Sequence, residues 1–348
     1  MNNEVTVYKK RFHSNLFISV FICSALIALS SCFTEKNIAP PSNQNVGTTE
    51  VIEMGPAYSD QFFYNLETNT VVSQNSRFAY DLMFDCDATK FNVWLNTAKS
   101  MSLVRTTKTE LQNVTIADTA GLKWHYELGS FNVDSNAFGA WWNNLSSQPT
   151  SAGAVYIIFL GKDAEGESLG YAKMKVNDFT GSSYSITFAG IADTVSSTAL
   201  IQKDASRNYA YFDLINSKNV ADIEPNKLNW DLCFTRYSII FYQPFYLPYE
   251  VTGVLHNPGK VQAYLDSTLL YDSVTINTFN TSKLSTDRDA IGYTWKLIND
   301  PQGQAQYSIK FNFVYLIKAG EDKYYKLRFY DFYRNTVKGY PAFEYYRL

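Results

Sequence analysis

Short alternating runs of apolar and polar residues dominate this chain from about residue 55 onward. Gly, Asn, Asp and Ser bound most of these runs, which is typical of antiparallel β-sheets. The pattern therefore predicts a fold built almost entirely from antiparallel strands. The clearest runs in the first half are residues 62–66, 78–84, 91–95, 155–160 and 171–176.

Helical spacing is confined to one segment of the mature chain. Residues 135–145 begin at an Asp-Ser pair that suits a helix cap. They carry four large apolar side chains at three- and four-residue spacings. We therefore expect a short helix here, and at most one or two short helices in an all-β chain.

The strand pattern occurs twice along the sequence. Residues 80–84 and 230–234 share the order aromatic-Asp-Leu-x-Phe, and hairpins that end near Phe179 and Phe332 also resemble each other. We expect a tandem duplication that gives two related β domains, since 348 residues suit two domains of about 150 residues each. The expected boundaries are residues 55–190 for the first domain, 191–207 for a linker and 208–348 for the second domain.

Alternation also predicts how the repeated strand lies against its core. Trp230, Leu232 and Phe234 fall on one side of an extended chain, while Asp231 and Cys233 fall on the other side. This arrangement describes a half-buried strand with one apolar face.

The first 32 residues have the features of a bacterial lipoprotein export signal. A basic segment precedes an apolar run at residues 16–29, and Leu29-Ser30-Ser31-Cys32 matches a lipobox. The apolar run is shorter than the roughly 20 residues that a membrane-spanning helix needs. We expect removal of residues 1–31, lipid attachment at Cys32 and a flexible tether over residues 32–54. The mature protein would then be held on a membrane by its lipid.

Composition narrows the classes of function. The formal net charge is −3, and no basic field suggests binding to nucleic acid. We find no nucleophile elbow, phosphate loop, paired zinc histidines or Cys-x-x-Cys motif, so we do not expect an enzyme. Asp85 and Asp87 indicate a solvated turn. Export would permit a disulfide between Cys86 and Cys233, but two separately packed thiols are favoured.

Several segments of the second half resemble the HmuY family, the outer-membrane haem-binding lipoproteins of the Bacteroidetes. The resemblance covers residues 208–348 best and residues 55–190 more weakly. It implies a β-rich, lipid-anchored protein that captures haem between two axial side chains for a partner transporter in the outer membrane. The segments that carry it are 209–214, Leu228-Asn229-Trp230-Asp231, Arg236-Tyr237, Gly253-Val254-Leu255, 314–315 and 326–332.

The histidines that often ligate haem in this family are missing from the corresponding segments, residues 275–288 and 298–303. Three other side chains are candidates, because haem iron accepts both imidazole and thioether ligands. His125 is favoured, since it lies in a strand-like stretch. Met101 lies in a loop-like stretch, and His256 precedes an expected turn.

An aromatic stretch at residues 241–249 is the most unusual loop of the chain. Its two prolines exclude it from a central strand. Its rings could stack on a porphyrin or on a sugar face, or they could fold over the end of the sheet as a small hydrophobic cluster. A glycan- or protein-binding surface lipoprotein that has lost the haem ligands is thus the alternative function. The stacking candidates are Phe241, Tyr242, Phe245, Tyr246 and Tyr249.

Replacement of Cys32 by Ala tests the lipid anchor. The variant lacks the thiol that accepts the lipid, so we expect it in the soluble fraction after detergent-free washing of membranes, whereas the wild-type protein stays in the pellet. Fractionation followed by immunodetection makes the measurement. A Cys32→Ala protein that remains in the membrane pellet would contradict the lipoprotein signal.

Overall fold

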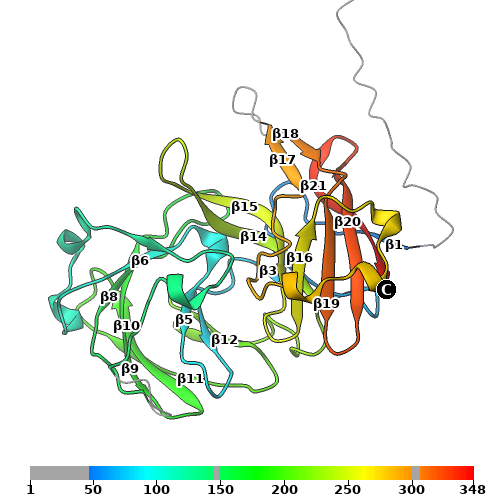
Figure 1. The fold of residues 1–348 in the computed structure, drawn as a ribbon. Coiled ribbons are helices and arrows are strands. Elements are labelled where there is room, and N and C mark those ends of the chain that lie inside the picture. Colours follow the sequence, from blue (N-terminus) through cyan, green and yellow to red (C-terminus); the bar gives the residue numbers. More distant parts are fainter. Residues whose placement is uncertain (1–46, 144–148, 300–305) are drawn as a thin grey trace, which may run out of the picture. The chain divides into compact units, whose positions relative to one another are not determined.

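The computed structural model describes residues 47–143, 149–299 and 306–348, which belong to one compact unit. The export signal and Cys32 lie outside the described residues. Five antiparallel sheets make up the fold (Figure 1), and the helices in the described part of the chain are single turns of 3-10 type. The expectation of an almost entirely β fold is confirmed.

Two larger sheets each contain strands that are mostly consecutive in sequence. The six-stranded sheet has the order β11-β10-β9-β8-β6-β7, and the five-stranded sheet has the order β1-β21-β20-β19-β16. The strands of the six-stranded sheet are β6 (Ser102–Arg105), β7 (His125–Tyr126), β8 (Tyr156–Phe159), β9 (Tyr171–Phe179), β10 (Ser183–Gly190) and β11 (Ser197–Gln202). Those of the five-stranded sheet are β1 (Thr48–Val51), β16 (Val261–Asp266), β19 (Val314–Ala319), β20 (Tyr324–Arg334) and β21 (Val337–Arg347).

Two four-stranded sheets combine strands from both halves of the chain. Their orders are β13-β12-β4-β5 and β3-β2-β14-β15. The first hairpin of each half therefore completes a sheet whose other two strands belong to the opposite half. The strands are β2 (Asp60–Asn65), β3 (Thr70–Ser76), β4 (Leu82–Asp85), β5 (Val93–Leu95), β12 (Tyr209–Asp213), β13 (Lys218–Val220), β14 (Leu232–Phe241) and β15 (Leu247–His256). A short pair, β17 (Lys296–Asn299) and β18 (Gln306–Ile309), forms the fifth sheet.

This reciprocal exchange of hairpins crosses the expected boundaries. The β2–β3 hairpin pairs with β14, and the β12–β13 hairpin pairs with β4. The segment 191–207, expected as a linker, contains β11, which pairs with β10. The division of the chain into two related domains stays a prediction, but a cut near residue 200 would separate strands that are hydrogen-bonded to each other.

A buried aspartate fixes each exchanged hairpin. Asp81 Oδ2 accepts a hydrogen bond of 2.8 Å from the backbone N–H of Leu214, just after β12, and Asp231 Oδ2 accepts one of 2.8 Å from Leu66, just after β2. Lys99 forms an ion pair with Asp81, and Lys260 Nζ lies 2.7 Å from Asp231 Oδ1. Because a buried carboxylate is costly without partners, these pairs fix the position of both hairpins.

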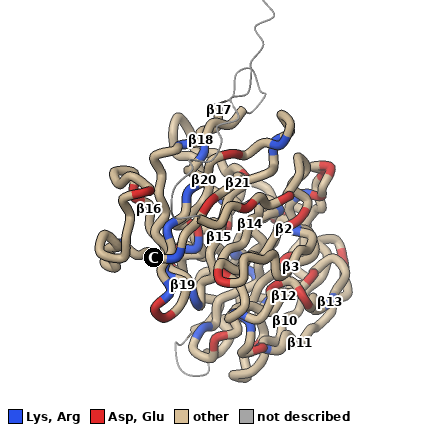
Figure 2. The backbone as a smooth tube through the Cα atoms, turned by 90° about the vertical axis from the view of Figure 1, so that its right-hand side faces the viewer, with Lys and Arg blue, Asp and Glu red and all other residues tan. Residues whose placement is uncertain are grey.

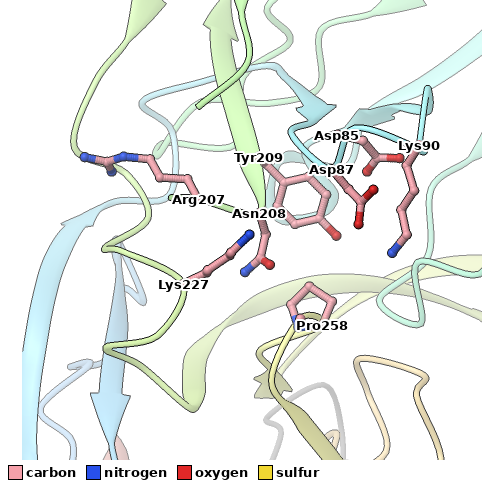
Figure 3. A pocket seen from close by; sticks show the side chains of 9 residues that line it. Asp85, Asp87, Lys90, Arg207, Asn208, Tyr209, Lys227 and Pro258 are labelled. Carbon is pink, nitrogen blue, oxygen red and sulfur yellow. The ribbon is translucent and has the colours of Figure 1, made fainter. Parts of the chain in front are cut away.

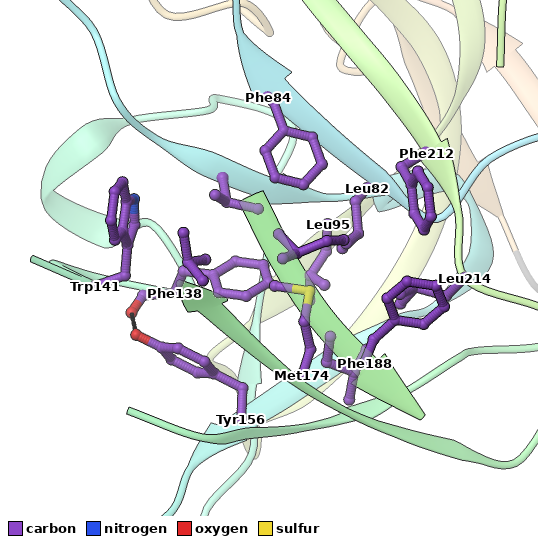
Figure 4. Close-up of a cluster of buried hydrophobic side chains, with 14 of the residues drawn as sticks. Leu82, Phe84, Leu95, Phe138, Trp141, Tyr156, Met174, Phe188, Phe212 and Leu214 are labelled. Atoms are coloured by element: carbon purple, nitrogen blue, oxygen red, sulfur yellow. Dashed lines mark hydrogen bonds between the residues drawn. The ribbon is translucent and has the colours of Figure 1, made fainter. Parts of the chain in front are cut away.

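The repeated strand is buried on both faces, so the prediction of a half-buried strand is wrong. Leu232 and Phe234 pack into one core cluster, whereas Trp230 and Cys233 pack into another with Phe63. The covering of both faces by other elements explains the difference. The first half has the same division: Leu82 and Phe84 lie in a core with Met174 and Phe188 (Figure 4), while Tyr80 and Met83 belong to a second cluster.

The helix expected at residues 135–145 is not formed over the part that the structure describes. Only the 3-10 turn Val133–Ser135 precedes an irregular segment, and residues 144–148 lie outside the described residues. Asn136 Nδ2 donates to the carbonyl of Val93 at 2.9 Å, and Trp141 Nε1 donates to the carbonyl of Phe91 at 2.7 Å. These bonds fix a loop across the core, so the apolar spacing reflects loop packing.

Two smaller expectations are resolved by packing. The tether expected at residues 32–54 is too long, because Thr48–Val51 forms β1 against β21 and Ile52 is buried. Cys86 and Cys233 are free buried thiols, as favoured. Burial raises the pKa of Cys233 to about 12, so this thiol stays protonated and behaves as an apolar side chain.

Replacement of Lys99 by Met tests the role of the Asp81 pair. The variant leaves a buried carboxylate without its cation, so we expect a loss of about 3–5 kcal/mol in the free energy of unfolding. Urea denaturation at pH 7 makes the measurement. Lys323→Met breaks the exposed pair with Glu67 and is the matched control, with an expected change below about 1 kcal/mol. Equal effects of the two variants would contradict the proposed importance of the buried pair.

Candidate functional site

The β14–β15 hairpin extends well beyond the sheet that contains it (Figure 1). Each of its strands has ten residues, whereas the corresponding strands β4 and β5 have four and three. Pairing continues to the end of the hairpin, where Phe241 lies opposite Leu247. β15 is an edge strand, which explains why Pro248 is tolerated within it.

The aromatic rings at the end of this hairpin face solvent. Tyr242, Phe245, Tyr246 and Tyr249 are 66%, 63%, 53% and 41% exposed, and Phe241 is half-buried. They contact mainly one another: the ring centroids of Tyr242 and Tyr246 are 6.0 Å apart, and those of Phe241 and Tyr249 are 5.6 Å apart. The rings do not form a buried cluster over the sheet. A group of exposed aromatic rings is typical of a binding surface.

His125 lies in β7, the edge strand of the six-stranded sheet, and its side chain is exposed. The segment that follows β7 contacts β14, because the N–H of Gly129 donates a 3.0 Å hydrogen bond to the carbonyl of Ser238. Burial, with smaller contributions from Tyr126 and Tyr242, raises the pKa of Tyr246. The structure therefore brings the β7 edge near the aromatic end of the hairpin, although the two lie far apart in sequence.

Met101 lies where an external ligand has no access to it. It is 1% exposed and packs in the same core as Leu82 and Leu103. The loop-like sequence before it corresponds to the 3-10 turn Thr97–Lys99 and to Ser100 in the left-handed region. Met101 itself begins the approach to β6 and faces inward, so its placement argues against a role as haem ligand.

His256 is also enclosed. It ends β15 opposite Leu232 and is fully buried, and the expected turn follows it at Asn257–Lys260. Its Nδ1 lies 3.3 Å from the carbonyl of Asn257, and its Nε2 has no hydrogen-bond partner among the described residues. Burial is the main reason that the pKa of His256 falls to about 4. The imidazole is therefore neutral at pH 7, yet no external haem reaches it.

Two buried charged groups, Glu224 and Lys296, are not indicated by any pattern in the sequence. The Glu224 carboxylate accepts hydrogen bonds from Trp230 Nε1 at 3.1 Å and from the N–H of Tyr209 at 3.1 Å. Lys296 Nζ lies 4.2 Å from the Trp295 ring centroid and 4.9 Å from that of Phe332, and burial lowers its pKa to about 7. Both groups are satisfied by their surroundings, which indicates a structural role.

Part of the chain matches a known protein family. Residues 205–345 match the HmuY protein family. The expected resemblance is thus confirmed for this HmuY region, which includes the aromatic end of the β14–β15 hairpin. His125 lies outside the HmuY region. Of the family segments expected to carry ligands, residues 300–303 lie outside the described residues.

Two solved structures are similar to parts of the chain. A candidate lipoprotein of Bacteroides fragilis shares 15% identity, with 49% of this chain and 91% of that chain covered and a TM-score of 0.22. The apo form of a HmuY analog from Tannerella forsythia shares 16% identity, with 40% and 91% covered and a TM-score of 0.16. No curated protein matches the chain.

Neither the distribution of charged residues nor a cluster of metal-binding side chains marks a further site in the part of the chain that the structure describes. Lys and Arg positions are interspersed with Asp and Glu along the backbone (Figure 2). Within the described ranges, no three His, Cys, Asp or Glu side chains gather to hold a metal ion. No helix in those ranges is long and apolar enough to cross a membrane.

Replacement of His256 by Leu tests how the enclosed imidazole affects the stability of the fold. Leu suits this position, because Leu95 occupies the corresponding place opposite Leu82. The unfolded chain binds a proton at His256 below about pH 6.5, but the folded protein does so only below about pH 4. The wild-type protein should therefore lose stability as the pH falls through this window, by about 3 kcal/mol relative to the variant.

Denaturation curves of both proteins at pH 7 and pH 4 measure this difference. The buried carboxyl groups are common to both proteins, so the comparison isolates the imidazole. A stability difference between the proteins that does not change with pH would show that His256 is accessible to protons in the folded state.

Proposed function

We propose that this protein binds haem or a related flat ligand on the aromatic end of the β14–β15 hairpin. The exposure of Tyr242, Phe245, Tyr246 and Tyr249 carries the proposal. Large rings that face water do not stabilise the fold, because only buried apolar area does so. Flat π-surfaces stack well on such rings. The family match of residues 205–345 supports haem as the first ligand to test.

His125 is the side chain that best fits an axial role. Of the three candidates, Met101 and His256 are buried, whereas His125 is exposed at the β7 edge near the hairpin end. His125 would hold the iron through an imidazole nitrogen, and the rings of the hairpin would cover the porphyrin. The bound haem would supply its absorption spectrum as a readout.

The cellular role follows from the proposed anchor. With lipid on Cys32, the protein would be held at the outer membrane, where it would capture its ligand without chemical conversion and pass it to a transporter. The described body begins at residue 47, so about 15 residues separate it from the lipid. A segment of this length, if extended, spans at most about 50 Å.

We also infer that the two halves arose by duplication. Matching hydrogen bonds support this inference: Asn96 Nδ2 donates to the carbonyls of Arg77 and Tyr80, and Asn257 Nδ2 donates to those of Lys227 and Trp230. The long β14–β15 hairpin is a feature of the second half alone, which suits a function acquired by that half.

A glycan- or protein-binding lipoprotein is the second candidate. The missing histidines of the family ligand segments favour it, and so does the position of His125 outside the HmuY region. Tyrosine-rich surfaces combine apolar area with hydroxyl groups, which suits sugars and proteins as well as porphyrins. This candidate uses the same hairpin end but needs no iron ligand.

A haem titration of the lipid-free protein tests the leading proposal. We expect a shifted Soret band, because an axial ligand changes the electronic state of the iron. His125→Ala should abolish the shift. The double change Phe245→Ala and Tyr246→Ala should weaken binding about tenfold or more, since each lost stacking contact is worth about 0.5–1.5 kcal/mol in addition to its buried area.

Phe311→Ala is the matched control, because Phe311 is 50% exposed on a different loop. It should bind haem as the wild-type protein does. A spectrum equal to that of free haem with the wild-type protein would reject haem as the ligand and leave the glycan or protein candidate. A shifted spectrum that survives His125→Ala would reject only the assigned ligand.

A further inference from the structure

A polar pocket lies at the end of β4 where Asp85 pairs with Tyr209, away from the turn between β12 and β13. It has a volume of about 140 Å³ and opens between the β4–β5 connection, the start of β12 and the turn after β15 (Figure 3). This volume is well below the roughly 300 Å³ of pockets for drug-sized ligands, so the pocket suits a smaller molecule than a porphyrin. Its lining includes Asp87, Lys90, Asn208, Lys227, Pro258 and Gly259.

Two ammonium groups of the pocket, those of Lys90 and Lys227, stand out because they form no close ion pair with another described residue. Among the described residues, neither Lys90 nor Lys227 forms an ion pair, whereas the nearby guanidinium of Arg207 pairs with Asp204 and Asp222. The charge of Lys90 acts on the carboxyl groups of Asp85 and Asp87, so Lys227 is the group that most favours an anion in the pocket.

The carboxylates that line the pocket accept hydrogen bonds from their own surroundings, although Asp87 uses only one of its two oxygens. Asp85 accepts hydrogen bonds from Trp94 Nε1 at 2.9 Å and from Asn92 Nδ2 at 2.7 Å. Asp87 Oδ1 accepts from the N–H and the hydroxyl of Thr89 at 2.8 and 2.7 Å. Asp85 is therefore not the solvated turn residue that the sequence predicted, and neither acid neutralises the two lysines by direct contact.

The sheet β3-β2-β14-β15 has a site that corresponds to this pocket, and there the site is filled by side chains of the protein. There Arg77 takes the position of Lys227, as the matching bonds from Asn96 and Asn257 establish. The turn Pro258–Gly259 corresponds to Thr97–Ala98, whose carbonyls accept bonds from Ser238 and Arg77.

In that corresponding site the anion is a side chain of the protein, the carboxylate of Glu250. Glu250 Oε2 lies 3.1 Å from Arg236 Nη2 and 3.7 Å from Arg77 Nη1, and its Oε1 accepts a 2.6 Å hydrogen bond from the Ser100 hydroxyl. Glu250 and Arg236 lie on the long β14–β15 hairpin. The β4–β5 connection is shorter, and its Asp87 lines the pocket without forming a close ion pair with Lys227.

We propose that the pocket binds a small hydroxylated carboxylate, such as a sugar acid, whose carboxylate takes the place that Glu250 holds in the corresponding site. Lys227 and Lys90 bind the carboxylate. Asn208 Oδ1 and Asp87 Oδ2, which accept no hydrogen bond from described residues, take hydrogen bonds from hydroxyl groups of the ligand. Gly259 allows the turn after β15 to approach Asn208, because a Cβ at residue 259 would lie 2.6 Å from Asn208 Oδ1.

Calorimetric titration with three sugar acids, galacturonate, glucuronate and N-acetylneuraminate, tests the proposal. At least one should bind, and galactose, which matches galacturonate without the charge, should not. Lys227→Met should weaken binding at least tenfold, and Lys227→Arg should restore most of it. Lys123→Met removes an exposed lysine outside the pocket and should have no effect.

Thermal unfolding of each variant checks that the fold is retained. Binding of galactose as tight as that of galacturonate, or unchanged affinity in Lys227→Met, would overturn the proposal. Equally tight binding of inorganic phosphate would overturn the assignment to a sugar acid, and failure of all three acids to bind would overturn the site. None of these outcomes depends on the haem titration, because the pocket does not include the hairpin end.

Discussion

The buried aspartates Asp81 and Asp231 hold the structure together. Each lies at the start of a core strand and accepts a hydrogen bond from a backbone N–H of a hairpin that comes from the other half of the chain. A carboxylate in this setting needs its lysine and its N–H donor together. The exchanged hairpins are therefore fixed in register at the same points where the charges are neutralised, and the two halves depend on each other for their sheets.

This interdependence changes the meaning of the family match. The HmuY region begins near the β12–β13 hairpin, yet that hairpin pairs with β4 of the first half. The strand that completes the sheet of the HmuY region is β2, from residues 60–65. The region that matches by sequence is thus not the set of strands that pack together, because pairing follows the exchanged hairpins.

The difference in length between the β14–β15 hairpin and the β4–β5 hairpin accounts for both candidate sites. The long β14–β15 hairpin brings Glu250 over the turn at Thr97–Ala98, which closes that place with an ion-pair network. The same extension carries the aromatic rings away from the sheet into solvent. The short β4–β5 connection leaves the corresponding place beside Lys227 open.

The sequence by itself determined the β character, the strand positions near residues 62–66 and 155–160, the repeated Asp-Leu-x-Phe strand and the HmuY resemblance. These features depend on local alternation and composition, which the chain carries residue by residue. Only the tertiary structure decided that Trp230 and Leu232 lie in different cores, that Met101 and His256 are buried, and that the hairpins are exchanged. Burial on both faces and strand pairing depend on which distant segments meet, and alternation within one strand does not specify its partner.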